Sequence, residues 1–146
     1  RSNYFQHVGN EGRRLREKVG VIDLTPFTKF EVTGPGAEGW LDSLVANKVP
    51  TKVGRIALCH ALTQRGGIRS EFTITKLADH HYYVVSAGAA ERYDSDFLQK
   101  RLPTDGSVAL RNITGSRGVF VLAGPRARDV LAKAHLKASD IRALAM

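Results

Sequence analysis

One cysteine, one methionine and one tryptophan occur among the 146 residues, and only 14 residues are acidic. The single Cys59 excludes an internal disulfide and a zinc site built from several thiolates. No apolar stretch approaches the ~20 residues that a membrane-spanning helix needs. The N-terminal residues also lack the apolar segment of a secretory signal. We therefore expect a protein of a reducing compartment that has no membrane partner.

Length and composition suit one globular domain. Hydrophobic residues make up 42% and charged residues 25% of the 146 positions, which is ordinary for a globular protein. This length is enough for one proper core, or for two small lobes that share a sheet. Because the first residue is Arg rather than Met, we expect a piece of a longer protein or a processed product. We expect residues 1–146 to form one compact unit.

The net charge of +8 favours negatively charged partners. Nucleic acid, an anionic surface and a small polyanion would all be attracted. Basic residues gather near both ends of the chain, at Arg13, Arg14, Arg16 and Lys18 and again at Arg126, Arg128, Lys133 and Lys137. Both basic groups could equally be the solvated faces of two helices, with no anionic partner. No aromatic residues interleave with these basic runs, so they do not predict a stacking platform for single strands, and we expect no nucleic-acid partner.

Hydrophobic periodicity predicts an α+β fold with mostly antiparallel strands and packed helices. Strands are expected at 29–34, 54–63, 68–77, 82–87, 107–114 and 118–123, and helices at 7–18, 35–46, 88–102 and from 125 onward. The "QRGG" turn joins 54–63 and 68–77 into a hairpin. Residues 20–27 are expected to be a buried connector, because Pro26 interrupts their apolar run.

The chain also predicts an internal repeat. A strand, a Gly-Pro entry and a helix occur twice with an offset of 90 residues, as the sequence positions show. Gly34 and Pro35 correspond to Gly124 and Pro125, and the apolar residues of both helices fall in the same phase. Two strand–Gly-Pro–helix half-units of similar build are therefore expected.

Few residues offer chemistry by their spacing alone. His80 and His81 are adjacent and are best explained as a turn pair, and His60 has no partner at metal-ligand spacing. Cys59 lacks a local base and is expected to be a small buried residue. The glycines of "VTGPG" and "LAGPR" match no nucleotide-binding motif. We expect no metal site.

Glu71 is the most informative carboxylate. Alternation places Ile68, Phe72 and Ile74 on the core side of its strand. Arg69 and Glu71 are then expected on the other side. If that side faces water, Glu71 is a solvated strand residue, whereas if it lines a cavity, the carboxylate would hold a cation or a protonated amine. The alternation does not choose between these two interpretations.

Three segments resemble the glycine-cleavage T-protein family of aminomethyltransferases. "VGVIDLTPFTKFEVTGPGAEGWLDSLVANKV" resembles the family's opening, "GRIALCHALTQRGGIRSEFTITKL" its acidic hairpin "GRxxYTxxLNExGGIxDDLxV", and "FVLAGPRARDVL" its "LALQGPxAxxVL" segment. Their order and spacing agree across most of the chain. The leading residues and "GGIRSE" look most like the C-terminal folate-binding region of dimethylglycine and sarcosine dehydrogenases. The chain stops before the family's "GYTGExGxE" stretch, so the resemblance implies the N-terminal portion of a truncated T-protein-like fold.

The resemblance also implies a chemistry. Such proteins pass the one-carbon iminium unit from an N-methyl amine to tetrahydrofolate and form methylenetetrahydrofolate. Glu71 takes the position of the catalytic carboxylate, and Ser70 that of the preceding acid. Phe27, Leu58 and Ser86 take positions at the pterin pocket, Leu58 in place of a Tyr and Ser86 in place of an Asn. The implied partners are folate, including polyglutamates, an amine substrate and an FAD-containing oxidoreductase domain in the same chain.

Three functions follow as hypotheses. The chain is an aminomethyltransferase-like enzyme domain, a non-catalytic folate-binding or regulatory module, or a basic RNA-binding domain. Ser70 and Leu58 favour the second because they depart from the family pattern, and charge alone supports the third. The implied location is cytoplasmic, or the mitochondrial matrix in a eukaryote.

Overall fold

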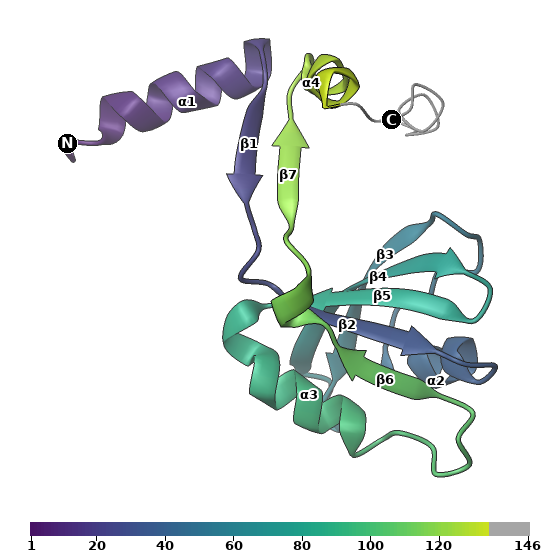
Figure 1. The fold of residues 1–146 in the computed structure, drawn as a ribbon. Coiled ribbons are helices and arrows are strands. Elements are labelled where there is room, and N and C mark those ends of the chain that lie inside the picture. Colours follow the sequence, from purple (N-terminus) through teal and green to yellow (C-terminus); the bar gives the residue numbers. More distant parts are fainter. Residues whose placement is uncertain (135–146) are drawn as a thin grey trace. The chain divides into compact units, whose positions relative to one another are not determined.

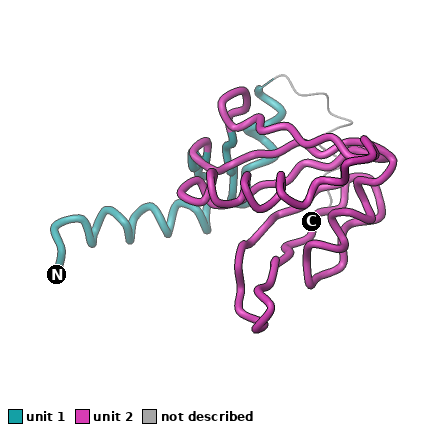
Figure 2. Tube along the Cα trace, turned by 90° about the horizontal axis from the view of Figure 1, so that it is seen from below, with its two compact units in different colours: residues 1–24, 119–146 teal, residues 25–118 magenta. Residues whose placement is uncertain are grey.

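A computed structural model describes residues 1–134 of the chain (Figure 1). They form two compact units: Thr25–Gly118, and Arg1–Leu24 together with the described residues from Val119 onward (Figure 2). We expected one unit. Strand pairing explains the difference, because β1 (Gly20–Asp23) and β7 (Phe120–Ala123) pair with each other in a sheet of their own.

The larger unit contains a five-stranded sheet with the order β3-β4-β5-β2-β6. Its strands are β2 (Thr28–Thr33), β3 (Ile56–Leu62), β4 (Ile68–Ala78), β5 (His81–Ser86) and β6 (Ala109–Asn112). Every neighbouring pair is antiparallel. The strands of the predicted hairpin, β3 and β4, pair with each other, and β5, predicted as the next strand, pairs with β4. The predicted α+β class is therefore confirmed.

Two helices cover one face of this sheet. They are α2 (Ala37–Leu44) and α3 (Glu91–Gln99), and a 3₁₀ turn, η1 (Gly88–Ala90), precedes α3. The core between sheet and helices holds Phe30, Phe72, Ile74 and Val84 from the strands and Trp40, Leu41, Phe97 and Leu98 from the helices, all buried. Burying a side chain of this size contributes about 1.5–3 kcal/mol. The sheet's other face leaves the apolar side chains of Ile56 and Leu58 exposed.

The smaller unit has little core of its own. It contains α1 (Phe5–Glu17), the β1–β7 ribbon and α4 (Ala127–Lys133), and neither helix has a buried residue. The segment 20–27 was expected to be a buried connector, but Val21 in β1 is 64% exposed. The reason is that β1 has β7 as its neighbour and that no helix within the described residues packs it into a core. Lys137 of the second basic group lies outside the described residues.

The predicted repeat is present in both units. Gly34 and Gly124 each follow a strand with φ of 115° and 118°, and each carbonyl accepts the third residue's N–H at 3.0 Å, from Ala37 and Ala127. A Cβ on Gly34 would lie 2.3 Å from the carbonyl oxygen of Ser107, so backbone packs where a side chain would be. Glycine is therefore required at both turns for its positive φ and for close approach.

Glu38 ties α2 to the sheet. It accepts a hydrogen bond from Lys76 Nζ of β4 at 2.8 Å and another from the hydroxyl of Tyr82 in β5. The hydrogen bond from Lys76, followed by that from Tyr82, lowers the pKa of Glu38. The same bond with Glu38 raises the pKa of Lys76, and burial raises the pKa of Tyr82. The folded state therefore favours a charged Glu38 and Lys76 and a neutral Tyr82.

This network predicts a pH dependence of stability. Because the folded pKa of Glu38 lies below its usual value of 4.5, the stability that it contributes is present above that value and is lost as pH falls through the folded pKa. Glu38→Gln should lower the free energy of unfolding at neutral pH, and the gap from wild type should close as the solution is acidified. Urea denaturation at a series of pH values measures the gap. A gap that stays constant into the acid range would contradict the assignment.

Candidate functional site

A pocket opens where β4 extends beyond β5. The pairing of these strands begins at Thr73 and Val85, so residues 68–72 of β4 have β3 as their neighbour but lack β5 on the other side. The pocket has a volume of 280 Å³, just below the range of about 300–1,000 Å³ for small-molecule sites. Its polar and aromatic lining includes Phe27, Arg69, Ser70, Glu71, Ser86 and Asp94. We call it the Glu71 pocket.

Three of the four residues singled out from the sequence meet in this pocket. Phe27 comes from the segment before β2, Glu71 from β4 and Ser86 from the end of β5. Leu58 does not line it: it lies opposite Thr73 on β3 with 49% of its surface exposed. The sheet thus brings together residues that are up to 59 positions apart in the sequence, from Phe27 to Ser86. Their roles in binding and catalysis stay predictions.

Glu71 is both exposed and paired. Its side chain is 61% exposed, and its Oε2 lies 3.1 Å from Nε2 of His60. The two residues are directly opposite each other in the β3–β4 register, where cross-strand side chains meet. We expected no ligand-spaced partner for His60, and sequence spacing could not reveal this one because the hairpin creates it. His60 holds the Glu71 carboxylate at the rim of the pocket.

The predicted faces of β4 are wrong at its first two residues. Ile68 is 69% exposed rather than buried. Arg69 instead turns toward α3, and its guanidinium carbon lies 4.3 Å from the ring centre of Tyr93 and 4.6 Å from that of Phe97. The cause is an irregularity in register, since Leu62 pairs with Ile68 while Ala61 pairs with Ser70. A β-bulge of this kind adds one residue, here Arg69, and reverses the alternation before it.

A second carboxylate reaches the pocket from α3. The hydroxyl of Ser70 donates to Oδ1 of Asp94 at 2.6 Å, and Asp94 is 1% exposed. Ser70, which the resemblance assigns to the first acidic position of the hairpin, therefore has an acid from α3 beside it. We did not predict Asp94. Its signal was its helical spacing of three and four residues from Phe97 and Leu98, which places a charged residue on an apolar face.

Ser86 carries an unsatisfied polar atom. It is 3% exposed, and its Oγ has no hydrogen-bond partner among the described residues. A buried polar group left without a partner costs about 1–3 kcal/mol, so a bound group that bonds to this hydroxyl would recover the loss. Because Ser86 lines the Glu71 pocket, this orphaned hydroxyl fits a polar ligand there.

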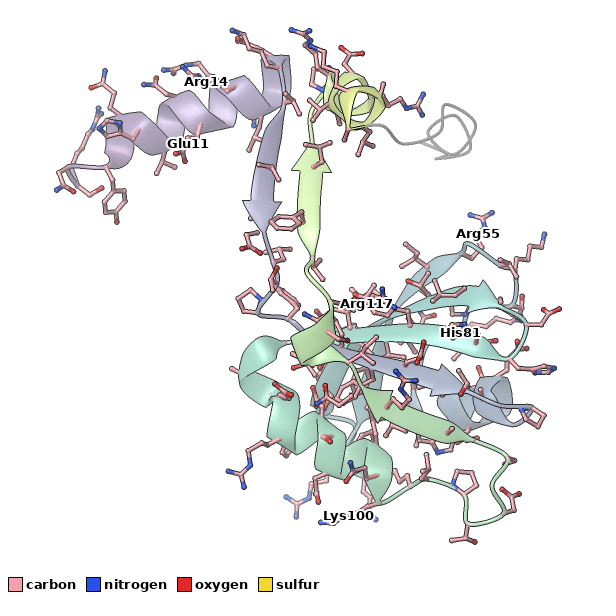
Figure 3. All side chains as sticks on the ribbon, viewed as in Figure 1. Glu11, Arg14, Arg55, His81, Lys100 and Arg117 are labelled. Carbon is pink, nitrogen blue, oxygen red and sulfur yellow. The ribbon has the colours of Figure 1, made fainter. Side chains whose placement is uncertain are left out.

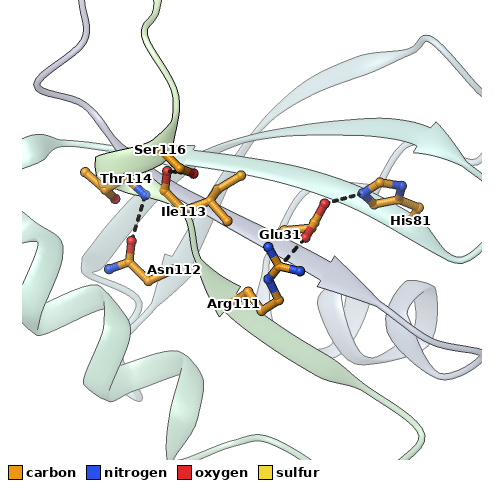
Figure 4. A network of polar contacts seen from close by, with 7 residues as sticks. All are labelled: Glu31, His81, Arg111, Asn112, Ile113, Thr114 and Ser116. Atoms are coloured by element: carbon orange, nitrogen blue, oxygen red, sulfur yellow. Dashed lines mark hydrogen bonds and ion pairs between the residues drawn. The ribbon is translucent and has the colours of Figure 1, made fainter.

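The strand beside Ser86 is held in place by a polar network. Thr28 donates its hydroxyl to the carbonyl of Ala87 at 3.2 Å. The backbone N–H of Lys29 donates to Thr114 Oγ1 at 3.0 Å. Asn112 Oδ1 in turn accepts the N–H of Thr114 at 2.9 Å, as Figure 4 shows. These bonds fix the start of β2, and therefore Phe27, next to the end of β5.

Other candidate chemistry is weak within residues 1–134. No three side chains of His, Cys, Asp or Glu come together there in a way that could hold a metal ion. His80 occupies a turn with φ of 56°, and His81 begins β5 and pairs with Glu31 at 3.0 Å (Figure 4). Burial raises the pKa of the Cys59 thiol, which disfavours its reactive thiolate. Across the same range, the helices are too short or too polar to cross a membrane.

Fold and pocket together define an aminomethyltransferase-type α+β domain. The fold matches the crystal structure of the glycine cleavage system aminomethyltransferase T from Bartonella henselae, with a TM-score of 0.79 and 25% identity over 90% of this chain and 36% of that one. The model of the GCVT N-terminal domain matches residues 1–146. The chain therefore belongs to the GCVT N-terminal domain family, as the resemblance predicted.

Two relatives of similar identity carry different names, one that of an enzyme and the other that of a regulatory subunit. The mitochondrial dimethylglycine dehydrogenase of Rattus norvegicus is 38% identical over 134 residues, which cover 91% of this chain and 16% of that protein. The mitochondrial pyruvate dehydrogenase phosphatase regulatory subunit of Mus musculus is 32% identical over 133 residues, covering 90% and 15%. The chain thus spans about one sixth of the length of these relatives.

Proposed function

We propose that the chain binds tetrahydrofolate and takes part in capturing the one-carbon unit of an N-methyl amine such as dimethylglycine or sarcosine. The observation that carries the proposal is the convergence of Phe27, Glu71 and Ser86 on one pocket. The same three residues stand at family motif positions in the sequence. We further propose that an FAD-containing oxidoreductase domain of the same protein generates the iminium, and that in a eukaryote the protein works in the mitochondrial matrix.

Each pocket residue has a task in this proposal. Tetrahydrofolate supplies the amine nitrogens that accept the carbon of the positively charged iminium, and the demethylated amine leaves with the two released protons. The Glu71 carboxylate stabilises that charge and orients the amine, and His60 at 3.1 Å keeps the carboxylate in place. Phe27 offers an aromatic surface for a flat ring. The Ser86 hydroxyl, which lacks a partner, bonds to a polar edge of the ligand.

Ser86→Ala separates binding from folding. Removing the unsatisfied hydroxyl should leave the free energy of unfolding unchanged or raise it slightly, because no hydrogen bond is lost. The same change should weaken binding of folinate, a stable tetrahydrofolate, by about tenfold, the value of one hydrogen bond. Calorimetric titration gives the affinity, and urea denaturation gives the stability.

Ser43→Ala is the matched control. Ser43 lies exposed on α2, where its hydroxyl donates to the carbonyl of Trp40 at 2.7 Å, away from the pocket lining. It should leave folinate affinity at the wild-type value. The proposed function fails if the wild-type chain does not bind folinate, or if both serine variants bind it equally well.

A non-catalytic folate-binding module is the second candidate. The likeness to a phosphatase regulatory subunit favours it, as does Ser70 at the position of the family's first acid. The enzyme domain and the binding module differ in the product that amine oxidation yields when tetrahydrofolate is present. A module of this kind would bind folinate and respond to Ser86→Ala, but amine oxidation would release free formaldehyde whether or not tetrahydrofolate was present.

A further inference from the structure

Three arginines surround a second hollow next to the Glu71 pocket. It has a volume of 480 Å³ and is lined by Leu62, Thr63, Gln64, Arg65, Arg69 and Arg101. The first four belong to the hairpin turn and its flank, Arg69 is the bulge residue, and Arg101 follows α3. We call it the arginine hollow. Within residues 1–134 no acidic residue lines it, so the charges that these residues bring to it are all positive.

The three guanidinium groups are available to an anion. None of them forms an ion pair with any described residue, although the described part of the chain contains such pairs elsewhere. Arg69 Nε is buried and has no hydrogen-bond partner there. Arg101 donates to the carbonyl of Phe97 at 3.3 Å and stacks on the Phe97 ring at 4.2 Å, which fixes its plane. Arg69 is held against the same ring.

The guanidinium groups of the arginine hollow are suited to bind the oxygens of an anion. Guanidinium forks bind carboxylate and phosphate oxygens in pairs, and they bind more strongly when the side chain is already held in position. The stacking on Phe97 holds Arg69 and Arg101 in this way, and it leaves their polar edges to the hollow. The buried Nε of Arg69 has lost its water without gaining an acceptor, which costs free energy. An anion that accepts a hydrogen bond from it would offset that cost.

Arg69 connects the two sites, because it lines both the arginine hollow and the Glu71 pocket. We propose that the arginine hollow binds the carboxylates of the ligand whose ring occupies the Glu71 pocket, namely the glutamate tail of tetrahydrofolate. This inference rests on the proposed function and adds a residue-level subsite to it. One ligand then spans both sites, with its amine at Glu71 and its anionic end at the arginines.

The test compares the affinities of two ligands that differ in the number of glutamates in the tail. Tetrahydrofolate monoglutamate and triglutamate are titrated into the 146-residue chain, into Arg65→Gln with Arg101→Gln, and into Arg55→Gln. Arg55 carries the same charge and lies near the start of β3, outside both lining sets (Figure 3). Wild type should prefer the triglutamate by about tenfold or more, the value of one to two charge-assisted bonds. The double variant should lose most of that preference, and Arg55→Gln should keep it.

The outcomes separate this inference from the function on which it rests. If the monoglutamate binds and the double variant keeps the preference for triglutamate, the arginine hollow is not the tail site. If the double variant instead weakens dimethylglycine binding, the carboxylate belongs to the amine substrate and the inference is wrong. If neither folate binds wild type, the proposed function itself fails. Arg69 packs on two rings and is left intact; its Nε–H resonance should shift with both ligands, and further with the triglutamate than with the monoglutamate.

Discussion

Glu71→Gln should abolish most one-carbon transfer while leaving amine oxidation intact. Among the described residues that line the pocket, Glu71 carries the one negative charge that is exposed enough to reach an iminium, since Asp94 is buried and bonded to Ser70. Removing a preorganised electrostatic group costs about 100- to 1,000-fold in turnover. The readout is the ratio of free formaldehyde to methylenetetrahydrofolate formed by the complete protein. Glutamine keeps the shape of the side chain, so folinate affinity should change little.

Glu31→Gln is the control for this experiment. Glu31 is also a strand glutamate in the same sheet, and it pairs with His81 at 3.0 Å much as Glu71 pairs with His60 (Figure 4). It does not line the pocket. Transfer should therefore stay at the wild-type level in this variant. If Glu71→Gln still forms methylenetetrahydrofolate at the wild-type rate, Glu71 is a solvated strand residue, the alternative that its sequence pattern left open.

Phe72→Ala should cause the largest loss of stability. Phe72 is 1% exposed and stacks on Phe97 with ring centres 6.4 Å apart. Truncating a buried phenylalanine to alanine costs about 3–5 kcal/mol through lost burial and the cavity that remains. A domain of this size is stable by about 5–15 kcal/mol, so a large share of the stability would be lost. Phe97, on which Arg69 and Arg101 stack, would also lose a neighbour, so tail binding should weaken as well.

Ile56→Ala tests the opposite case. Ile56 begins β3 on the uncovered face of the sheet and is 63% exposed. Its truncation should change the free energy of unfolding by roughly 0.5 kcal/mol or less, as exposed positions do. Urea denaturation of both variants gives the comparison. Equal losses would show that the core is not between the sheet and its two helices.

The fold was largely predictable because its signals are local. Alternation and helical spacing gave the strands and helices of the larger unit, and the Gly34 and Gly124 turns gave the repeat. The connector 20–27 was the exception. Its apolar run predicts burial, but a two-stranded ribbon has no second layer to bury it against, and Val21 is exposed.

The site was predictable only where motif spacing carried it. Matching "GGIRSE" selected Glu71, and the sheet placed it beside Phe27 and Ser86. The partner of each group was not visible in the sequence. His60 meets Glu71 through the hairpin register, and Arg69 reverses its direction because one bulge residue is added. Partners of this kind depend on pairing between distant segments, which periodicity within one strand does not encode.

The most direct test follows the backbone amide resonances of the 146-residue chain during a titration with folinate. We predict that shifts will concentrate at Phe27, Glu71 and Ser86, three segments that only the folded pocket brings together. Leu58, outside the lining, should shift less. Shifts confined to the basic residues of α1, or no shifts at saturating folinate, would contradict the assignment of this pocket as the folate site.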